Sequence, residues 1–193
     1  MRSETIAGCS PAAALNITTP GVRPARSFPR RSTAPRANFK NEDDHMEGMT
    51  ELDRLLALED IKLLKARRDR AADTKDWDLY LSLHAPDHVS HNEGFPRWGS
   101  AQEMIDNVSQ LMGDHRITVH HSHTPEITFE TATRANGIWG MEDMIFDAET
   151  KELLIHGFGF YHETYEKRGD VWLFTSRQLK RTHVETSPSL EQA

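Results

Sequence analysis

The second half of the sequence restricts the fold most strongly. Four segments, at residues 115–130, 136–147, 152–167 and 171–184, are rich in aromatic and β-branched residues. Turn signals such as "DAET" and "KRGD" lie between them, a pattern typical of consecutive strands joined by short turns. A short additional strand is expected at residues 87–92. This part of the chain therefore has to form a sheet.

The segment before these strands is predicted to be helical. "TELDRLLALEDIKLLKARRDRAAD" begins with Thr50, a good N-cap, and Asp53 follows three residues later as in a capping box. The next 23 residues contain no proline or glycine, so they are expected to form one long helix. A second helix is expected in "DWDLYLSLHAP", ending before Pro86, and a third in "GSAQEMIDNVSQLMG", between Ser100 and Gly113. Helices followed by strands predict an α+β fold, with the helices packed on one face of a curved sheet.

Length and composition limit the class of protein. A chain of 193 residues with 37% hydrophobic and 27% charged residues suits one globular domain. No apolar run approaches the ~20 residues that a membrane-spanning helix needs, so no membrane partner is expected. Cys9 is the only cysteine, which excludes an internal disulfide and a zinc site built on several cysteines. A reducing compartment fits this composition, and we expect a cytoplasmic protein.

The first 45 residues differ from the rest. They hold five of the nine prolines, and their seven basic and four acidic residues give a net charge of +3. The whole chain carries −7, so residues 46–193 carry −10, which argues against a nucleic-acid partner. We expect a disordered Pro/Arg-rich leader at 1–45 that contributes no core, a folded domain at 46–186, and a flexible C-terminal tail at 187–193.

Asp73, near the end of the long helix, is the first candidate for chemistry. It lies eighteen residues after Leu55, a whole number of helical turns, and so should point inward with the apolar stripe of Leu52, Leu56 and Leu63. Burying a carboxylate raises the free energy of the folded state unless the carboxylate is paired or hydrogen-bonded. The alternatives are a side chain turned back to solvent, or a cap for the helix that begins at "KDWD".

The segment "TVHHSHTPEITF" places three histidines within four residues. His121 and His123 share one face of a strand and could be two zinc ligands, but neither a carboxylate frame such as H-E-x-x-H nor a cysteine frame accompanies them. We therefore expect no metal. The other interpretation is a single catalytic imidazole oriented by an acid such as Asp73. Histidines that only form hydrogen bonds in the sheet remain a third possibility.

Several segments resemble a known family. "IKLLKARRDRAADTKDWD", "HHSHTPEITF", "GIWGMEDMIF", "GFYHETYEKRGDVWLF" and "LKR" occur in an order similar to SnoaL-like proteins of the nuclear transport factor 2-like superfamily. The chain most resembles the bile-acid dehydratases, and more distantly the scytalone dehydratases and a dehydrochlorinase of the same fold. The resemblance spans roughly residues 50–184.

This resemblance implies a cone-shaped roll of three helices closing one side of a strongly curved, mainly antiparallel sheet. It implies a catalytic pair of Asp73 and His120, with Arg181 as a basic residue of the pocket. Arg68 stands where the dehydratases have a tyrosine, so a hydroxyl that could protonate a leaving group is missing from that position. Strand alternation would instead turn His121 and His123 inward. We favour His120, because a pocket face should be the polar one and Pro125 could introduce a bulge.

The function expected is that of a cofactor-independent lyase, dehydratase-like, that acts on a small apolar ring-containing molecule. An isomerase or cyclase that uses the same pair, or a non-catalytic ligand-binding module, are the alternatives. A homo-oligomer, dimer or trimer, is expected. The residues expected to bind substrate are Arg68, Trp77, His123, Trp139, Met141, Asp143 and Phe158.

Overall fold

The computed structural model describes residues 49–92 and 96–190. The leader expected at residues 1–45 lies outside this part of the chain, as do residues 191–193. The element order is α1 (Glu51–Thr74), α2 (Trp77–Ser82), β1 (His84–Asn92), α3 (Ala101–Leu111), β2 (Arg116–Thr131), β3 (Arg134–Asp147), β4 (Leu153–Arg168) and β5 (Val171–Thr186). The expected α+β order of helices and strands is confirmed. None of the described helices is long and apolar enough to cross a bilayer.

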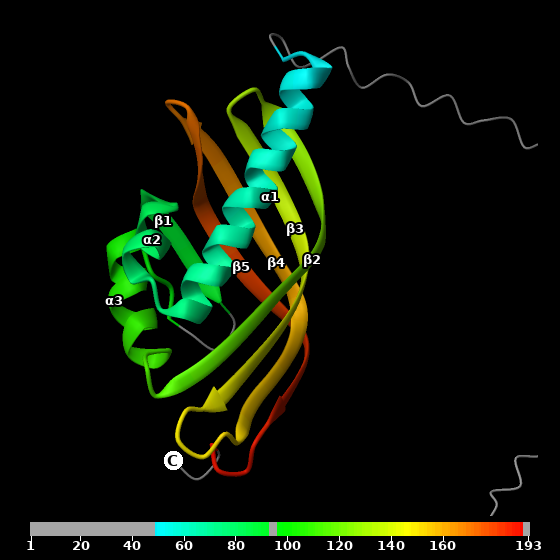
Figure 1. The fold of residues 1–193 in the computed structure, drawn as a ribbon. Coiled ribbons are helices and arrows are strands. Elements are labelled where there is room, and N and C mark those ends of the chain that lie inside the picture. Colours follow the sequence, from blue (N-terminus) through cyan, green and yellow to red (C-terminus); the bar gives the residue numbers. More distant parts are fainter. Residues whose placement is uncertain (1–48, 93–95, 191–193) are drawn as a thin grey trace, which may run out of the picture. The chain divides into compact units, whose positions relative to one another are not determined.

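One strongly curved sheet forms the frame of the folded unit. Its strand order is β1-β5-β4-β3-β2, with β1 parallel to β5 and the other neighbours antiparallel. Figure 1 shows α1 running along the inside of this curve, with α2 and α3 grouped beside β1 at one end. The helices therefore cover one face of the sheet, as the sequence predicts.

The start of α1 follows the predicted capping box. The Asp53 amide donates to Thr50 Oγ1 at 3.1 Å, and the Thr50 amide donates to the Asp53 carboxylate at 3.0 Å. The helix ends at Lys75, whose left-handed backbone (φ 62°) terminates the helical hydrogen bonds. The N-terminal signal lies within a few residues of the helix end, which is why the sequence alone could predict it. The end at Lys75 was not predicted, because no Gly or Asn marks it.

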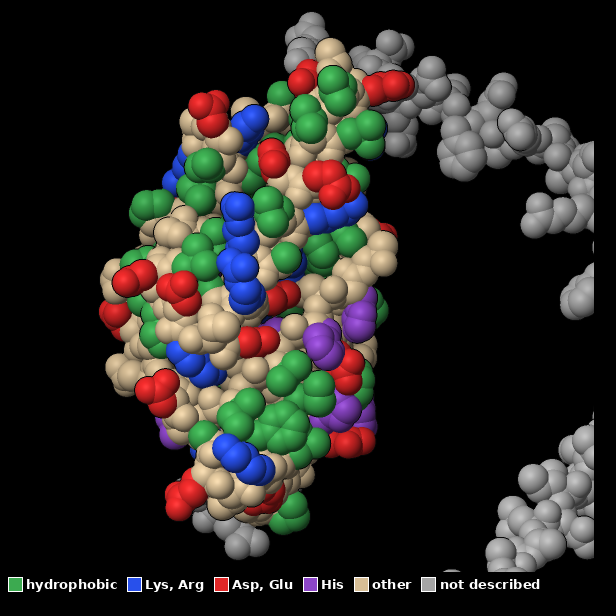
Figure 2. Space-filling model, viewed as in Figure 1, with side chains coloured by type: hydrophobic (Ala, Val, Ile, Leu, Met, Phe, Trp, Pro, Cys, Tyr) green, Lys and Arg blue, Asp and Glu red, His purple; other side chains and the backbone are tan. Residues whose placement is uncertain are grey.

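The inward face of α1 differs from the expectation. The predicted stripe of Leu52, Leu56 and Leu63 is wrong, because these side chains are exposed, as the green side chains along the upper part of α1 in Figure 2 illustrate. The side chains that face the sheet include small and apolar residues together with three charged ones. The buried positions of α1 are Ala57, Ile61, Leu64, Lys65, Arg68, Asp69, Ala71 and Ala72. Charged groups thus enter the interior from this helix, where each needs a partner.

Two apolar clusters flank the interior. One packs α1 against the inner face of the sheet around Ile61, Trp139, Tyr161 and Phe174. The other joins the end of α1 to α2 and α3 around Tyr80, Trp98 and Met104. Beyond β5, residues 187–190 form a turn in which the Ser187 amide donates to the Leu154 carbonyl. The first residues of the segment expected to be a flexible tail are therefore attached to β4.

Candidate functional site

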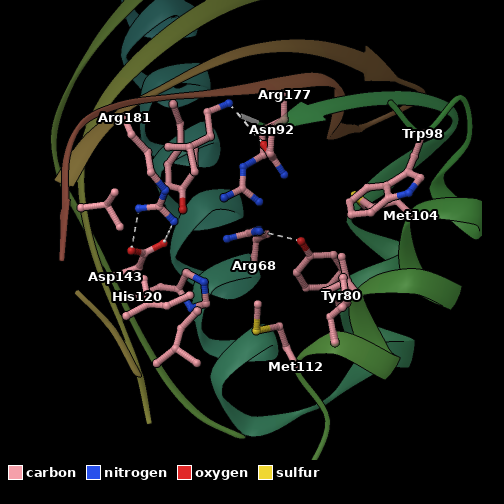
Figure 3. Close-up of a pocket in the computed structure, with 17 residues that line it drawn as sticks. Arg68, Tyr80, Asn92, Trp98, Met104, Met112, His120, Asp143, Arg177 and Arg181 are labelled. Atoms are coloured by element: carbon pink, nitrogen blue, oxygen red, sulfur yellow. Dashed lines mark hydrogen bonds and ion pairs between the residues drawn. The ribbon is translucent and has the colours of Figure 1, made fainter. Parts of the chain in front are cut away.

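A cavity of about 360 Å³ lies between the helices and the inner face of the sheet. Every helix and strand of the folded unit contributes to its wall, and Figure 3 shows the lining side chains converging from both sides. The lining consists of Arg68, Tyr80, Asn92, Trp98, Met104, Val108, Leu111, Met112, His120, Asp143, Ile145, Ile155, Tyr161, Arg177, Leu179, Arg181 and Val184. Most of these residues are apolar and a few are polar, the composition typical of a small-molecule site.

His120 lines this cavity, and Asp73 contacts His120 from behind the cavity wall. The His120 Nδ1 and Asp73 Oδ1 atoms are 2.6 Å apart, and the His120 amide donates to Asp73 Oδ2 at 2.9 Å. Thr118 Oγ1 donates to the same carboxylate at 3.0 Å. The carboxylate is thus fixed by three contacts, and it favours the tautomer that carries its proton on Nδ1. In that tautomer the Nε2 atom of His120 carries a lone pair that can accept a proton.

A bulge in β2 decides which histidine faces inward. The pairing of β2 with β3 shifts register between Ser122 and Pro125. Before the shift, Thr118, His120 and Ser122 point inward; after it, Ile127 and Phe129 do so and pack against the core. Simple alternation over the whole strand therefore assigns the wrong face to one half of it.

The other two histidines of the segment lie on the outer face. The His121 side chain is 54% exposed, with Nδ1 3.7 Å from the Glu142 carboxylate, whose other oxygen is 2.8 Å from His156 Nε2. His123 is exposed as well. Figure 2 shows histidine side chains gathered beside acidic ones on the sheet side of the molecule. In the described residues, no group of three or more His, Cys, Asp or Glu side chains has an arrangement that could hold a metal ion.

Arg68 links Tyr80, which lines the cavity, to Asp69, which lies outside the lining. Its Nη2 donates to the Tyr80 hydroxyl at 2.6 Å, and its Nη1 donates to Asp69 at 2.9 Å. The other oxygen of Asp69 accepts a hydrogen bond from Ser122 at 2.6 Å. Burial raises the pKa of the Tyr80 phenol, and this outweighs the opposing effect of the Arg68 charge, so the hydroxyl keeps its proton. Burial also acts to raise the pKa of Asp69, but Lys65 and Arg68 outweigh it and lower that pKa.

Arg181 and Asp143 form a two-point ion pair on the opposite wall. Arg181 Nη1 and Nη2 donate to the two oxygens of Asp143 at 3.0 and 2.9 Å. Gly157 makes room for this pair, because a Cβ atom there would overlap the Arg181 guanidinium and the Asp143 carboxylate. The pair holds the guanidinium in a fixed orientation at the cavity wall.

The structure brings some of the expected site residues together and places others elsewhere. Arg68, Asp143 and Arg181 line the cavity together with His120. Five of the expected substrate-binding residues lie outside it. Trp139 and Met141 belong to the core cluster, Trp77 packs edge-on against Tyr80, Phe158 contacts His156 and His183 on the outer face, and His123 is exposed.

Tyr80 and Arg177 are two cavity residues that the sequence reading missed. Arg177 shares the inward face of β5 with Leu179 and, beyond it, Arg181, so strand alternation could have identified it. Tyr80 is on a six-residue helix whose orientation depends on packing against α1 and α3. No local signal in the sequence indicates that its hydroxyl meets Arg68.

Comparison with known proteins gives consistent matches. A family model described as a SnoaL-like domain matches residues 53–178. The fold is similar to a crystal structure of a type 2 hexachlorocyclohexane dehydrochlorinase, with 20% identity, a TM-score of 0.65, and coverage of 72% of this chain and 93% of that one. It is also similar to a putative scytalone dehydratase from Novosphingobium aromaticivorans, with 17% identity, a TM-score of 0.66, and coverage of 72% and 92%.

Proposed function

Because the chain belongs to the SnoaL-like family, we propose that it is a cofactor-independent lyase that acts on a small apolar ring-containing molecule. The observation that carries this proposal is the 2.6 Å contact between His120 Nδ1 and Asp73 Oδ1 at the cavity wall. The names of the structurally similar proteins, a dehydrochlorinase and a putative scytalone dehydratase, point to the same type of reaction.

The first step of the proposed reaction is removal of a proton from carbon. His120 Nε2 accepts a proton from the carbon beside a carbonyl or phenolic ring of the substrate, and Asp73 stabilises the imidazolium that forms. The electrons of the broken C–H bond move into an enolate-type oxyanion. Arg181, held by Asp143, supplies a fixed positive charge for that oxyanion.

The second step is departure of a β-substituent. Arg68 stands where the family resemblance leads one to expect a tyrosine. Its guanidinium, however, donates a hydrogen bond to another phenol, that of Tyr80, which lines the cavity. Because Arg68 donates to the phenol oxygen, the phenol proton is free to pass to a leaving hydroxide, which departs as water. The phenolate that results is stabilised by the same guanidinium. Elimination uses a base to remove the proton and a separate acid to protonate the leaving group. An isomerisation needs only one group, which removes a proton and returns it at another carbon. The presence of a separate acid therefore favours elimination.

The test is a set of substitutions in the pair. His120→Ala should lower the turnover of β-hydroxy bicyclic ketones by about 10²–10⁴-fold, as expected for loss of a general base. Asp73→Asn should cost nearly as much, and the double variant should be little worse than His120→Ala, because the two act as a unit. His121→Ala, on the outer face, is the matched control and should keep its activity.

A second readout isolates proton abstraction from elimination. In D₂O, a ring ketone without a leaving group, such as 1-tetralone, should exchange its α-protons faster with the unaltered protein than with His120→Ala. Exchange that is equally fast in both proteins, together with unchanged turnover, would rule out His120 as the base. Saturable ligand binding without exchange or turnover would mean that the domain only binds its ligand.

A further inference from the structure

Two buried cations share one buried carboxylate where Arg177 lines the cavity, with Lys65 and Glu163 behind the cavity wall. Lys65 and Glu163 form an ion pair at 2.6 Å, with side chains 1% and 0% exposed. The second oxygen of Glu163 accepts a hydrogen bond from the Tyr165 hydroxyl at 2.6 Å. Both carboxylate oxygens are therefore already in use. Arg177 is the third charged residue at this place, and its side chain is 5% exposed.

Arg177 lies beside Glu163 without forming a hydrogen bond to it. Its Nε is 3.6 Å from Glu163 Oε1, and within residues 49–92 and 96–190 no hydrogen bond reaches the Arg177 guanidinium. The guanidinium is held over the Tyr161 ring, 3.8 Å from its centroid. Figure 3 shows Arg177 pointing into the cavity toward Arg68. Arg177 thus lines the cavity with a buried guanidinium that has no hydrogen bond to the described residues.

A buried cation of this kind is costly unless something else supplies the missing acceptor. The single carboxylate of Glu163 is shared by the two cations Lys65 and Arg177. A ligand group that neutralises the remaining positive charge therefore has to be negatively charged. The planar fork of a guanidinium matches the two oxygens of a carboxylate. We propose that the substrate of this site carries a carboxylate, which binds Arg177. This inference rests on the proposed function, because it concerns the molecule that the Asp73–His120 pair acts on.

The neighbouring arginines indicate a single negative charge. Arg68 is paired with Asp69, and Arg181 with Asp143, so each of these two cations already has an anion beside it. A dianion such as a phosphate monoester would need a second uncompensated cation. The rest of the wall includes apolar side chains such as Trp98, Met104 and Met112. The ligand is therefore a monocarboxylate on an otherwise apolar ring skeleton.

Two isosteric probes test the inference on the unaltered protein. By isothermal titration calorimetry, 2-naphthoate should bind about tenfold to a hundredfold more tightly than the neutral 2-naphthamide, the gain expected for charge-assisted hydrogen bonds. Arg177→Gln should remove this preference, and Arg177→Lys, which keeps the charge, should keep part of it. Arg134→Gln, on an exposed arginine paired with Glu166, is the matched control and should leave the preference intact.

The outcomes separate this inference from the proposed function. His120→Ala should still bind 2-naphthoate. If the unaltered protein prefers 2-naphthoate to 2-naphthamide but turns over no substrate, the inference stands and the lyase proposal falls. Equal affinity for 2-naphthoate and 2-naphthamide in the unaltered protein would overturn it, whatever the folding of the variants. It is also overturned if 2-naphthyl phosphate binds more tightly than 2-naphthoate, or if Arg177→Gln binds 2-naphthoate as tightly as the unaltered protein does.

Discussion

Replacing Tyr80 by phenylalanine removes one oxygen atom from the centre of the cavity wall. The ring is 1% exposed and would keep its packing, so the substitution opens no sizeable space. What it removes is the acceptor at 2.6 Å from Arg68 Nη2. The Arg68 Nε already lacks a hydrogen-bond partner among the described residues, so a second unsatisfied nitrogen would be added to a buried cation.

The expected loss of stability follows from that contact. A hydrogen bond to a charged group contributes about 1.5–3 kcal/mol. For a domain of this size each kcal/mol shifts the midpoint of thermal unfolding by about 2–4 °C, so Tyr80→Phe should lower Tm by about 3–12 °C. The variant should remain folded at 25 °C, because typical domains have 5–15 kcal/mol of stability.

The catalytic effect should depend on the leaving group. If Tyr80 protonates a departing hydroxide, Tyr80→Phe should lower kcat for a β-hydroxy ketone by about 10²–10³-fold, in the range of general acid catalysis. A β-chloro analogue releases chloride, which needs no proton, and should lose far less. The assay is the appearance of the conjugated product by ultraviolet absorbance for both substrates with both proteins.

Tyr165→Phe is the matched control. The Tyr165 hydroxyl donates to Glu163 and accepts from Trp139 Nε1, both outside the cavity lining, so its loss should cost comparable stability with no change in leaving-group preference. If Tyr80→Phe slows the hydroxy and chloro substrates equally, or slows neither, the assignment of Tyr80 as the acid is refuted.

Two further predictions concern buried charge. Burial lowers the pKa of His88 to about 4 from an unfolded value near 6.5, so its contribution to stability is present above pH 6.5 and is lost as pH falls toward 4. In urea unfolding, His88 should contribute a loss of about 2–3 kcal/mol from pH 7.5 to 4.5, and His84, whose pKa is also lowered by burial, should add to it. The profile should be shallower in His88→Gln and unchanged in the exposed control His183→Gln; a flat profile in the unaltered protein would contradict this. Lys65→Met leaves Glu163 buried without its closest cation and should cost about 3–5 kcal/mol in urea unfolding at pH 7.5. Lys62→Met removes an exposed pair one turn away and should cost at most about 1 kcal/mol, so equal losses would refute the role given to burial.

The sequence by itself determined the order and type of the elements. The capping box at Thr50, the turn signals between strands and the β-branched segments each act over a few residues, and the fold class followed from their order. The family resemblance supplied Asp73, His120 and Arg181 as candidates. Which histidine faces Asp73 was decided by the register shift before Pro125, which alternation along the strand does not reveal.

The tertiary structure decided the composition of the cavity. Hydrophobic periodicity assumes that the apolar side of a helix faces inward, but α1 exposes Leu52 and Leu56 and buries Lys65, Arg68 and Asp69. These charges are tolerated there because their partners come from distant parts of the chain, such as Glu163, 98 residues beyond Lys65. The free energy of a buried charge depends on the groups that surround it in space. Neither the contact of Tyr80 with Arg68 nor the sharing of Glu163 by Lys65 and Arg177 could therefore be inferred from local sequence.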